Sequence, residues 1–194
     1  MLQADHPWLT APAPAARPSV AGEPLTGAAA PQPGVAVPDA ADRLPRRESS
    51  RIAALWSVGA HGGAGETVLS RLVPESQAAD HCWPLHPDMT TNVVLVARSN
   101  AAGLLAAQRA AADWASGSLP GVSLLGLVII ADAPRRLPLA LRSSMRLVGG
   151  GVPRMWQLPW VESWRLGAAV EPESAPPRVR TAIADLSRHA MIAC

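Results

Sequence analysis

The feature that most constrains the fold is a glycine-rich segment, GAHGGAG at residues 59–65. An apolar run, IAALWSV at residues 52–58, precedes it and predicts a strand, and VLSRL at residues 68–72 predicts the start of a helix. Glycines let the backbone turn tightly and point its N–H groups at an anion, and a helix N-terminus adds partial positive charge. The order of strand, glycine loop and helix therefore predicts an α/β unit with an anion-binding loop.

The loop departs from the phosphate-binding loop pattern at one position. That pattern places a lysine directly before a Ser or Thr, whereas here Glu66 precedes Thr67, and all 17 Lys and Arg residues of the chain are arginine. A carboxylate in place of lysine removes one attraction for phosphate and adds one repulsion, each on the order of 4 kcal/mol at ~4 Å and an effective dielectric constant of ~20. We therefore expect weak ATP binding unless an arginine compensates. We also expect Glu66 to be stabilised by the helix dipole and to occupy the anion site of the loop itself.

Four apolar runs separated by helical patterns indicate the fold class. Strands are expected at residues 52–58, 92–97, 122–130 and 152–158, and the middle two runs are typical of parallel strands buried on both faces. Helices are expected at residues 101–116, 137–148 and 178–192. The expected apolar side of the last helix consists of Val179, Ile183, Leu186 and Ala190. The alternation predicts an α/β fold, a single small domain with a mainly parallel sheet flanked by helices.

Composition divides the 194 residues into four segments. Residues 1–50 are rich in Pro and Ala and predict a disordered arm, with Trp8 as its only aromatic residue. The expected domain spans residues 51–167, a Pro/Glu linker residues 168–177 and a C-terminal helix residues 178–194. The net charge of +2 gives no overall field for nucleic acid. Two cysteines make no disulfide framework and no apolar run approaches the roughly 20 residues of a membrane span, so we expect a cytoplasmic protein.

The loop and the order of the elements resemble the ParA/MinD family of P-loop ATPases. That family has a loop of the form xKGGxGKTT, and residues 61–68, HGGAGETV, match its glycine and small positions and its first threonine but neither lysine. Residues 92–114 look like the family's strand and helix after switch II. Residues 126–132 look like the strand that leads to its base-contacting loop, and residues 152–167 look like its final strand and the following helix. The resemblance covers roughly residues 51–167 and is closest to small, lysine-poor members from high-GC bacteria.

This resemblance implies a P-loop NTPase-like fold with ATP or ADP and Mg²⁺ at the loop, although the residues are equally compatible with no cofactor. The implied nucleotide-binding residues are Gly59, His61, Gly62, Gly63, Ala64, Gly65, Glu66, Thr67 and Val68. Ala131 and Asp132 are the implied base contacts, and Thr67 is the implied Mg²⁺ ligand. A single hydroxyl without a partner carboxylate is an incomplete metal site.

Residues 73–91 depart most from the family, which has switch I and the switch II aspartate there. The segment is polar and broken by proline, and it predicts no apolar strand. Its acids are expected to be solvated loop charges: Glu75, Asp80 and Asp88. A zinc site is not expected, because the available ligands lack a repeated spacing such as CxxC: His81, Cys82, His86 and Asp88. His61 stands at the family's signature lysine and is expected to make a hydrogen bond that stabilises the loop.

Residues 135–165 carry six arginines against one acid, Glu162. ParA-like proteins bind DNA without sequence preference through basic surfaces, so the resemblance permits such binding here, and a solvated basic helix is the alternative. The nucleic-acid candidates are Arg135, Arg136, Arg142 and Arg146. Three tryptophans in this segment are expected to belong to the core: Trp156, Trp160 and Trp164.

Together these patterns predict a degenerate ParA/MinD-like nucleotide-binding-fold protein with weak or no ATP hydrolysis. Its expected role is in partitioning or positioning, or in the biology of a mobile element. The alternative is a non-catalytic adaptor that keeps the fold and binds a protein or DNA without nucleotide. The expected partners are a protein whose identity the sequence does not give, non-specific DNA, and a second copy of the chain.

Overall fold

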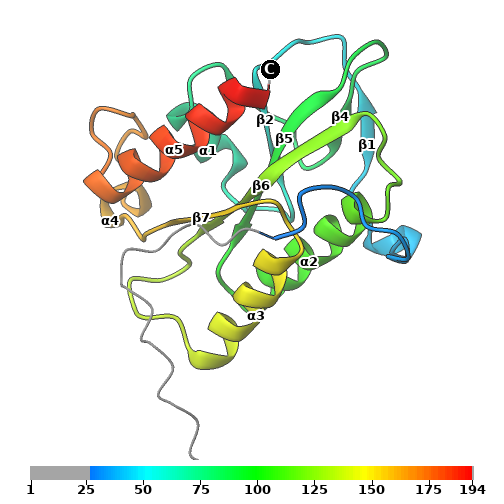
Figure 1. Cartoon of the computed structure of the whole chain (residues 1–194). Coiled ribbons are helices and arrows are strands. Elements are labelled where there is room, and N and C mark those ends of the chain that lie inside the picture. The colour runs from blue at the N-terminus through cyan, green and yellow to red at the C-terminus, as the bar shows by residue number, and fades with distance from the viewer. Residues whose placement is uncertain (1–26, 194) are drawn as a thin grey trace, which may run out of the picture.

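Five parallel strands form the central sheet, in the spatial order β3-β2-β5-β6-β7 (Figure 1). They are β2 (Leu55–Gly59), β3 (Ser76–Ala78), β5 (Thr91–Arg98), β6 (Val122–Ile130) and β7 (Met155–Leu158). The structure is a computed structural model that describes residues 27–193, so Trp8 lies outside the described residues. The expected α/β architecture with a mainly parallel sheet is confirmed.

The central strands form where the sequence predicts them because they are buried on both faces. β6 coincides with the predicted run 122–130, and all five residues of β2 are buried. β2 nevertheless begins at Leu55 rather than at Ile52, whose side chain is 72% exposed. β7 likewise begins at Met155, three residues after the start of the predicted run.

Helices cover both faces of the sheet (Figure 1). α1 (Glu66–Leu72) and α5 (Pro177–Ala193) pack on one face of the sheet, and their buried side chains belong to one apolar cluster with those of the strands. α2 (Ala101–Ala115) and α3 (Leu139–Gly150) pack on the other face, and α4 (Glu162–Arg165) is a short turn after β7. The buried side of α5 consists of the four residues that the periodicity predicts: Val179, Ile183, Leu186 and Ala190.

The strand order places a topological switch point between β2 and β5. Numbered along the chain, the strands of the central sheet lie in the order 2-1-3-4-5, which is one of the two common orders of doubly wound sheets. The connections from these two neighbouring strands run to opposite faces of the sheet, and in doubly wound sheets ligands bind in the crevice at such carboxyl ends. The glycine loop follows β2 and Arg98 ends β5, so both lie at this switch point.

Residues 27–50 pack against the domain, although their composition predicts part of a disordered arm. The amide of Gln32 donates to the carbonyl of Ala115 at 2.8 Å, and Leu44 is buried in the core. A 3-10 turn, η1 (Ala40–Asp42), is followed by β1 (Arg46–Glu48), which pairs with β4 (Trp83–Leu85) in a small parallel sheet. Packed structure therefore begins before Arg51. Backbone amides of non-proline residues in this segment donate to carbonyls of the domain.

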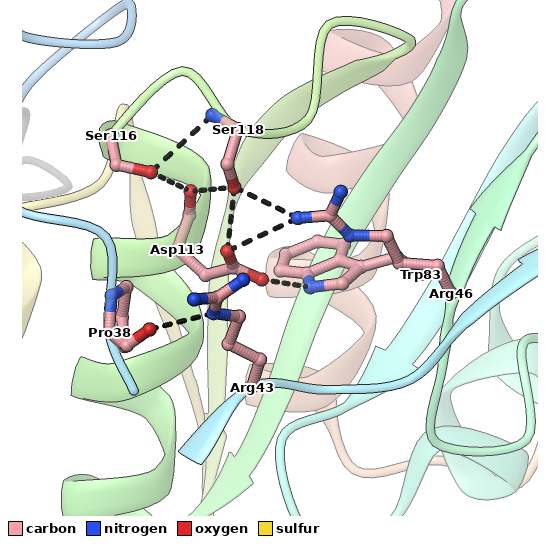
Figure 2. A network of polar contacts seen from close by, with 7 residues as sticks. All are labelled: Pro38, Arg43, Arg46, Trp83, Asp113, Ser116 and Ser118. Atoms are coloured by element: carbon pink, nitrogen blue, oxygen red, sulfur yellow. Dashed lines mark hydrogen bonds and ion pairs between the residues drawn. The ribbon is translucent and has the colours of Figure 1, made fainter. Parts of the chain in front are cut away.

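A buried carboxylate joins this small sheet to helix α2 (Figure 2). The side chain of Asp113 is fully buried and accepts hydrogen bonds from Trp83 Nε1 at 3.0 Å and from Ser118 Oγ at 2.7 Å. The guanidinium of Arg46 lies 3.7 Å from the same carboxylate. A buried charge is tolerated only when it is paired and hydrogen-bonded, so this network fixes β1 and β4 against α2.

Residues 73–91 contain two short strands, which corrects the expectation that no apolar strand lies there. β3 pairs with β2, and Trp83 of β4 is fully buried. The predicted linker 168–177 is also tied to the domain, since Ala175 is buried against the core on the α5 side. No helix among residues 27–193 is long and apolar enough to cross a membrane.

Candidate functional site

The glycine loop runs from the end of β2 at Gly59 to the start of α1 at Glu66. Gly65 precedes the helix with φ of +101°, in the left-handed region that favours glycine. A Cβ atom at Gly65 would also lie 2.7 Å from Cδ1 of Ile130, at the end of β6. Backbone conformation and packing against the sheet therefore both require glycine at this position.

The carboxylate of Glu66 binds backbone amides below the loop. Its Oε2 accepts hydrogen bonds from the amide of Gly59 at 2.7 Å and from the amide of His81 at 3.2 Å. No side chain caps the amides at the N-terminus of α1. The expected self-capping is therefore corrected in its detail: Glu66 joins the end of β2 to the segment after β3 and leaves the first-turn amides of the helix uncapped.

His61 stabilises the loop by hydrogen bonding, as expected. Its Nδ1 lies 2.8 Å from the carbonyl of Gly62, and its Nε2 lies 3.1 Å from the amide of Arg98. A neutral ring with its proton on Nδ1 satisfies both contacts, because Nδ1 then donates and Nε2 accepts. The imidazole thus joins the glycine loop to the end of β5.

Arg98 is the site residue that sequence reasoning missed. Its Nε donates to the carbonyl of Gly63 and its Nη1 to the carbonyl of Ala131, each at 3.3 Å. Within residues 27–193 it is the only arginine whose side chain is hydrogen-bonded to the glycine loop. The signal for it was its place at the carboxyl end of β5, the strand that lies beside β2 at the switch point.

The residues considered for metal binding do not come together. No group of three or more His, Cys, Asp or Glu side chains suited to a metal ion occurs in the part of the chain that the structure describes. His81 Nδ1 contacts the carbonyl of Gly59 at 2.6 Å, and the buried Sγ of Cys82 donates to the carbonyl of Ala79. His86 Nδ1 accepts from the amide of Asp88.

Thr67 is exposed on the first turn of α1, and two of the acids around it in the sequence, Glu66 and Asp80, have other partners. Glu66 is bound to two amides, and Asp80 forms an exposed ion pair with Arg47 at 3.2 Å. This donor set does not fit an Mg²⁺ ion held by the protein, since such sites use one or two carboxylates.

The implied base contacts lie beside two hollows at the carboxyl end of the sheet. Ala131 and Asp132 line a hollow of about 350 Å³ between the ends of the strands and α3. Ala131 also lines a second hollow of about 240 Å³ with Arg98, Trp160 and Trp164. The amide of Asp132 donates to Ser99 Oγ at 3.0 Å, which fixes the loop after β6 to the loop after β5.

The four arginines proposed for nucleic acid are all exposed. Arg135 and Arg136 line the larger hollow, and Arg142 and Arg146 lie on α3. Of the three tryptophans expected in the core, Trp156 is buried, with its Nε1 donating to Asp185 at 2.8 Å. Trp160 and Trp164 are only half-buried and line the smaller hollow; Trp164 packs against the core on the α5 side, so the core assignment is corrected for Trp160 alone.

Comparison with known proteins gives one match. Neither the curated proteins nor the solved structures contain a significant match to this chain. The profile of one protein family matches residues 53–183, from just before β2 into α5. The matched segment includes the whole glycine loop and the whole central sheet. Since the match covers more than half of the sequence, the chain belongs to this family, DUF6668, whose description is a family of unknown function.

Proposed function

We propose that this chain is a degenerate ParA/MinD-like nucleotide-binding-fold protein whose ATP hydrolysis is weak or lost. Its proposed role is in partitioning or positioning, or in the biology of a mobile element. The glycine loop at the switch point of a parallel sheet supports a binding site there, because ligands of doubly wound sheets bind in that crevice. Arg98 supports an anionic ligand, because it supplies a cation at the loop where the lysine is missing.

One observation carries the proposal of weak hydrolysis. Glu66 stands at the lysine position, and its carboxylate is hydrogen-bonded to the amides of Gly59 and His81. It therefore acts as a structural acceptor and supplies no positive charge to a phosphate. Without that charge, and without a carboxylate placed to hold Mg²⁺, the developing charge of phosphoryl transfer has little stabilisation.

Calorimetry of ATP and ADP binding to the full chain, with and without Mg²⁺, tests this proposal together with a phosphate-release assay. We expect weak binding and turnover at the background rate. Glu66→Gln removes the negative charge and keeps an acceptor for the two amides, so we expect it to bind ATP more tightly than the wild type. Turnover that depends on Mg²⁺ and is lost in Thr67→Ala would contradict the proposal of lost hydrolysis.

The second candidate is an adaptor that keeps the fold without nucleotide. It is favoured by the mutual hydrogen bonding of the site, in which Glu66, His61 and Arg98 all have protein partners. Such a loop needs no ligand to hold its shape. Absence of ATP and ADP binding to both the wild type and Glu66→Gln, at concentrations in the millimolar range, would favour the adaptor. Light scattering of the purified chain tests the homodimer that the resemblance implies.

A further inference from the structure

We propose that the larger hollow, at the carboxyl ends of β5, β6 and β7, is a docking site for an acidic amphipathic peptide segment of a partner protein. The site comprises this hollow and the arginine surface, which we define as Arg135, Arg136, Arg142 and Arg146. The glycine loop is not part of this site, although the implied base contacts, Ala131 and Asp132, line the same hollow.

The hollow suits an apolar anchor. Its volume of about 350 Å³ lies at the lower end of the range of roughly 300–1,000 Å³ for ligand pockets. Most of its wall is apolar, with side chains from β6, from β7, from α3 and from the loop before α3: Ile129, Leu137, Leu141, Met145 and Leu158. An apolar side chain of a partner would bury its surface here, and such anchored side chains carry most of the binding energy of protein interfaces.

The charge around the hollow is complementary to carboxylates. The four residues of the arginine surface are exposed, and no hydrogen bond or ion pair joins their side chains to any other residue in the range 27–193. The chain has no acid between Asp132 and Glu162, and Asp132 is the only acid that lines the hollow. Guanidinium groups bind carboxylates with two parallel hydrogen bonds, which gives such a partner both affinity and orientation.

The exposed side of α3 favours a peptide over a nucleic acid. Leu139 is 70% exposed and Leu147 is 69% exposed. At about 100° per residue, both leucines lie on the same side of the helix as Arg142 and Arg146. Phosphate contacts require only the arginines and would leave the leucines and the hollow unused. A peptide with acidic and apolar residues uses the arginines and the hollow together.

A random peptide library displayed on phage, selected against the full-length chain, tests the proposal. Selected peptides are synthesised and their affinities measured by fluorescence anisotropy. We expect them to combine Asp or Glu with a large apolar residue. The double charge reversal Arg135→Glu with Arg136→Glu should weaken their binding at least about tenfold. Ala133→Trp, which fills the exposed edge of the hollow and leaves the arginines in place, should weaken it to a similar extent.

The matched control is Arg71→Glu with Arg178→Glu. These arginines are equally exposed but lie on α1 and α5, on the other face of the sheet, so peptide affinity should stay within about twofold of wild type. Selection of no binder, or binders insensitive to both the Arg135/Arg136 reversal and Ala133→Trp, would overturn the proposal. It would also be overturned if the chain bound a random duplex DNA but no peptide, and if the Arg135/Arg136 reversal abolished this DNA binding while Ala133→Trp left it unchanged.

Discussion

Substitution of Glu66 separates the stability of the loop from its affinity for phosphate. Glu66→Ala leaves the amides of Gly59 and His81 without their common acceptor. Glu66→Gln keeps an acceptor but removes the charge, and Glu66→Lys removes the acceptor and reverses the charge. We expect all three variants to be less stable than the wild type and expect Glu66→Lys to bind ATP more tightly.

The magnitude follows from the two hydrogen bonds. Bonds to a charged group contribute about 1.5–3 kcal/mol each, and the bond at 3.2 Å is weaker than the bond at 2.7 Å. Glu66→Ala should therefore lower the free energy of unfolding by about 2–4 kcal/mol. Glu66→Gln should cost about half as much, since charge-assisted bonds are roughly twice as strong as neutral ones. The affinity for ATP should change in the opposite direction. Glu66→Lys removes the repulsion between the carboxylate and the phosphates, and even part of this repulsion exceeds about 1.4 kcal/mol, so the variant should bind ATP at least about tenfold more tightly.

Urea unfolding followed by circular dichroism measures the first effect, and calorimetry with ATP measures the second. For a chain of this size, the loss in Glu66→Ala corresponds to a melting temperature lower by about 4–16 °C. The matched control is Glu173→Ala, because Glu173 is exposed, and its unfolding free energy should change by less than about 0.5 kcal/mol.

Two results would refute this reasoning. If Glu66→Ala were as stable as Glu173→Ala, the two hydrogen bonds would contribute nothing to the fold. If the wild type already bound ATP in the micromolar range and Glu66→Lys bound it no more tightly, a group other than residue 66 would determine phosphate binding.

The remaining predictions concern buried and half-buried polar groups away from the loop. Asp113→Ala should lower the free energy of unfolding by about 2–4 kcal/mol, because Trp83 Nε1 and Ser118 Oγ lose their charged acceptor. Arg43→Gln, with one exposed bond to Pro38, should change the free energy of urea unfolding by less than about 0.5 kcal/mol. Burial alone would raise the pKa of Asp185, but hydrogen bonds from Trp156 and Arg188 and the charges of Arg154 and His189 hold that pKa below its ordinary value. Because the folded pKa is the lower one, this stabilisation is present above the unfolded pKa of about 3.9 and is lost as the pH falls through the folded pKa, so Asp185→Asn should flatten the pH dependence of unfolding below about pH 4. Burial raises the pKa of Cys82, so a thiol reagent near neutral pH should label it slowly in folded Cys194→Ser protein and quickly in denaturant, and fast labelling of the folded protein would contradict its burial.

The sequence predicted best those elements whose packing repeats along the chain. β6 is apolar over its whole length because both faces are buried, and α5 shows its buried side at helical spacing. By contrast, β1, β3 and β4 have three residues each, which is too short for any periodicity to appear. They form because a neighbouring strand offers backbone partners, and that information lies in the fold rather than in the segment itself.

The candidate site was predictable in its position and not in its contacts. The glycine spacing located the loop, and the composition showed that the chain has no lysine to place there. The partners of Glu66 come from the end of β2 and from His81, which is 15 residues away, and Arg98 is brought to the loop only by the pairing of β2 with β5. Such contacts depend on strand order, which one sequence does not specify residue by residue.

The positions of the two charges indicate how the loop would change if a phosphate entered. Both residues make charge-assisted bonds, but Glu66 accepts from two amides at 2.7 and 3.2 Å, whereas Arg98 donates to two carbonyls at 3.3 Å, slightly beyond the usual range of about 2.7–3.2 Å. An incoming anion therefore competes more easily for the guanidinium of Arg98 than for the amides bound to Glu66. Because Arg98 also spans the loops after β2 and β6, its release from Gly63 and Ala131 would loosen the crevice at the moment of binding. The lysine-free loop would thus couple any anion it accepts to the geometry of the neighbouring hollows.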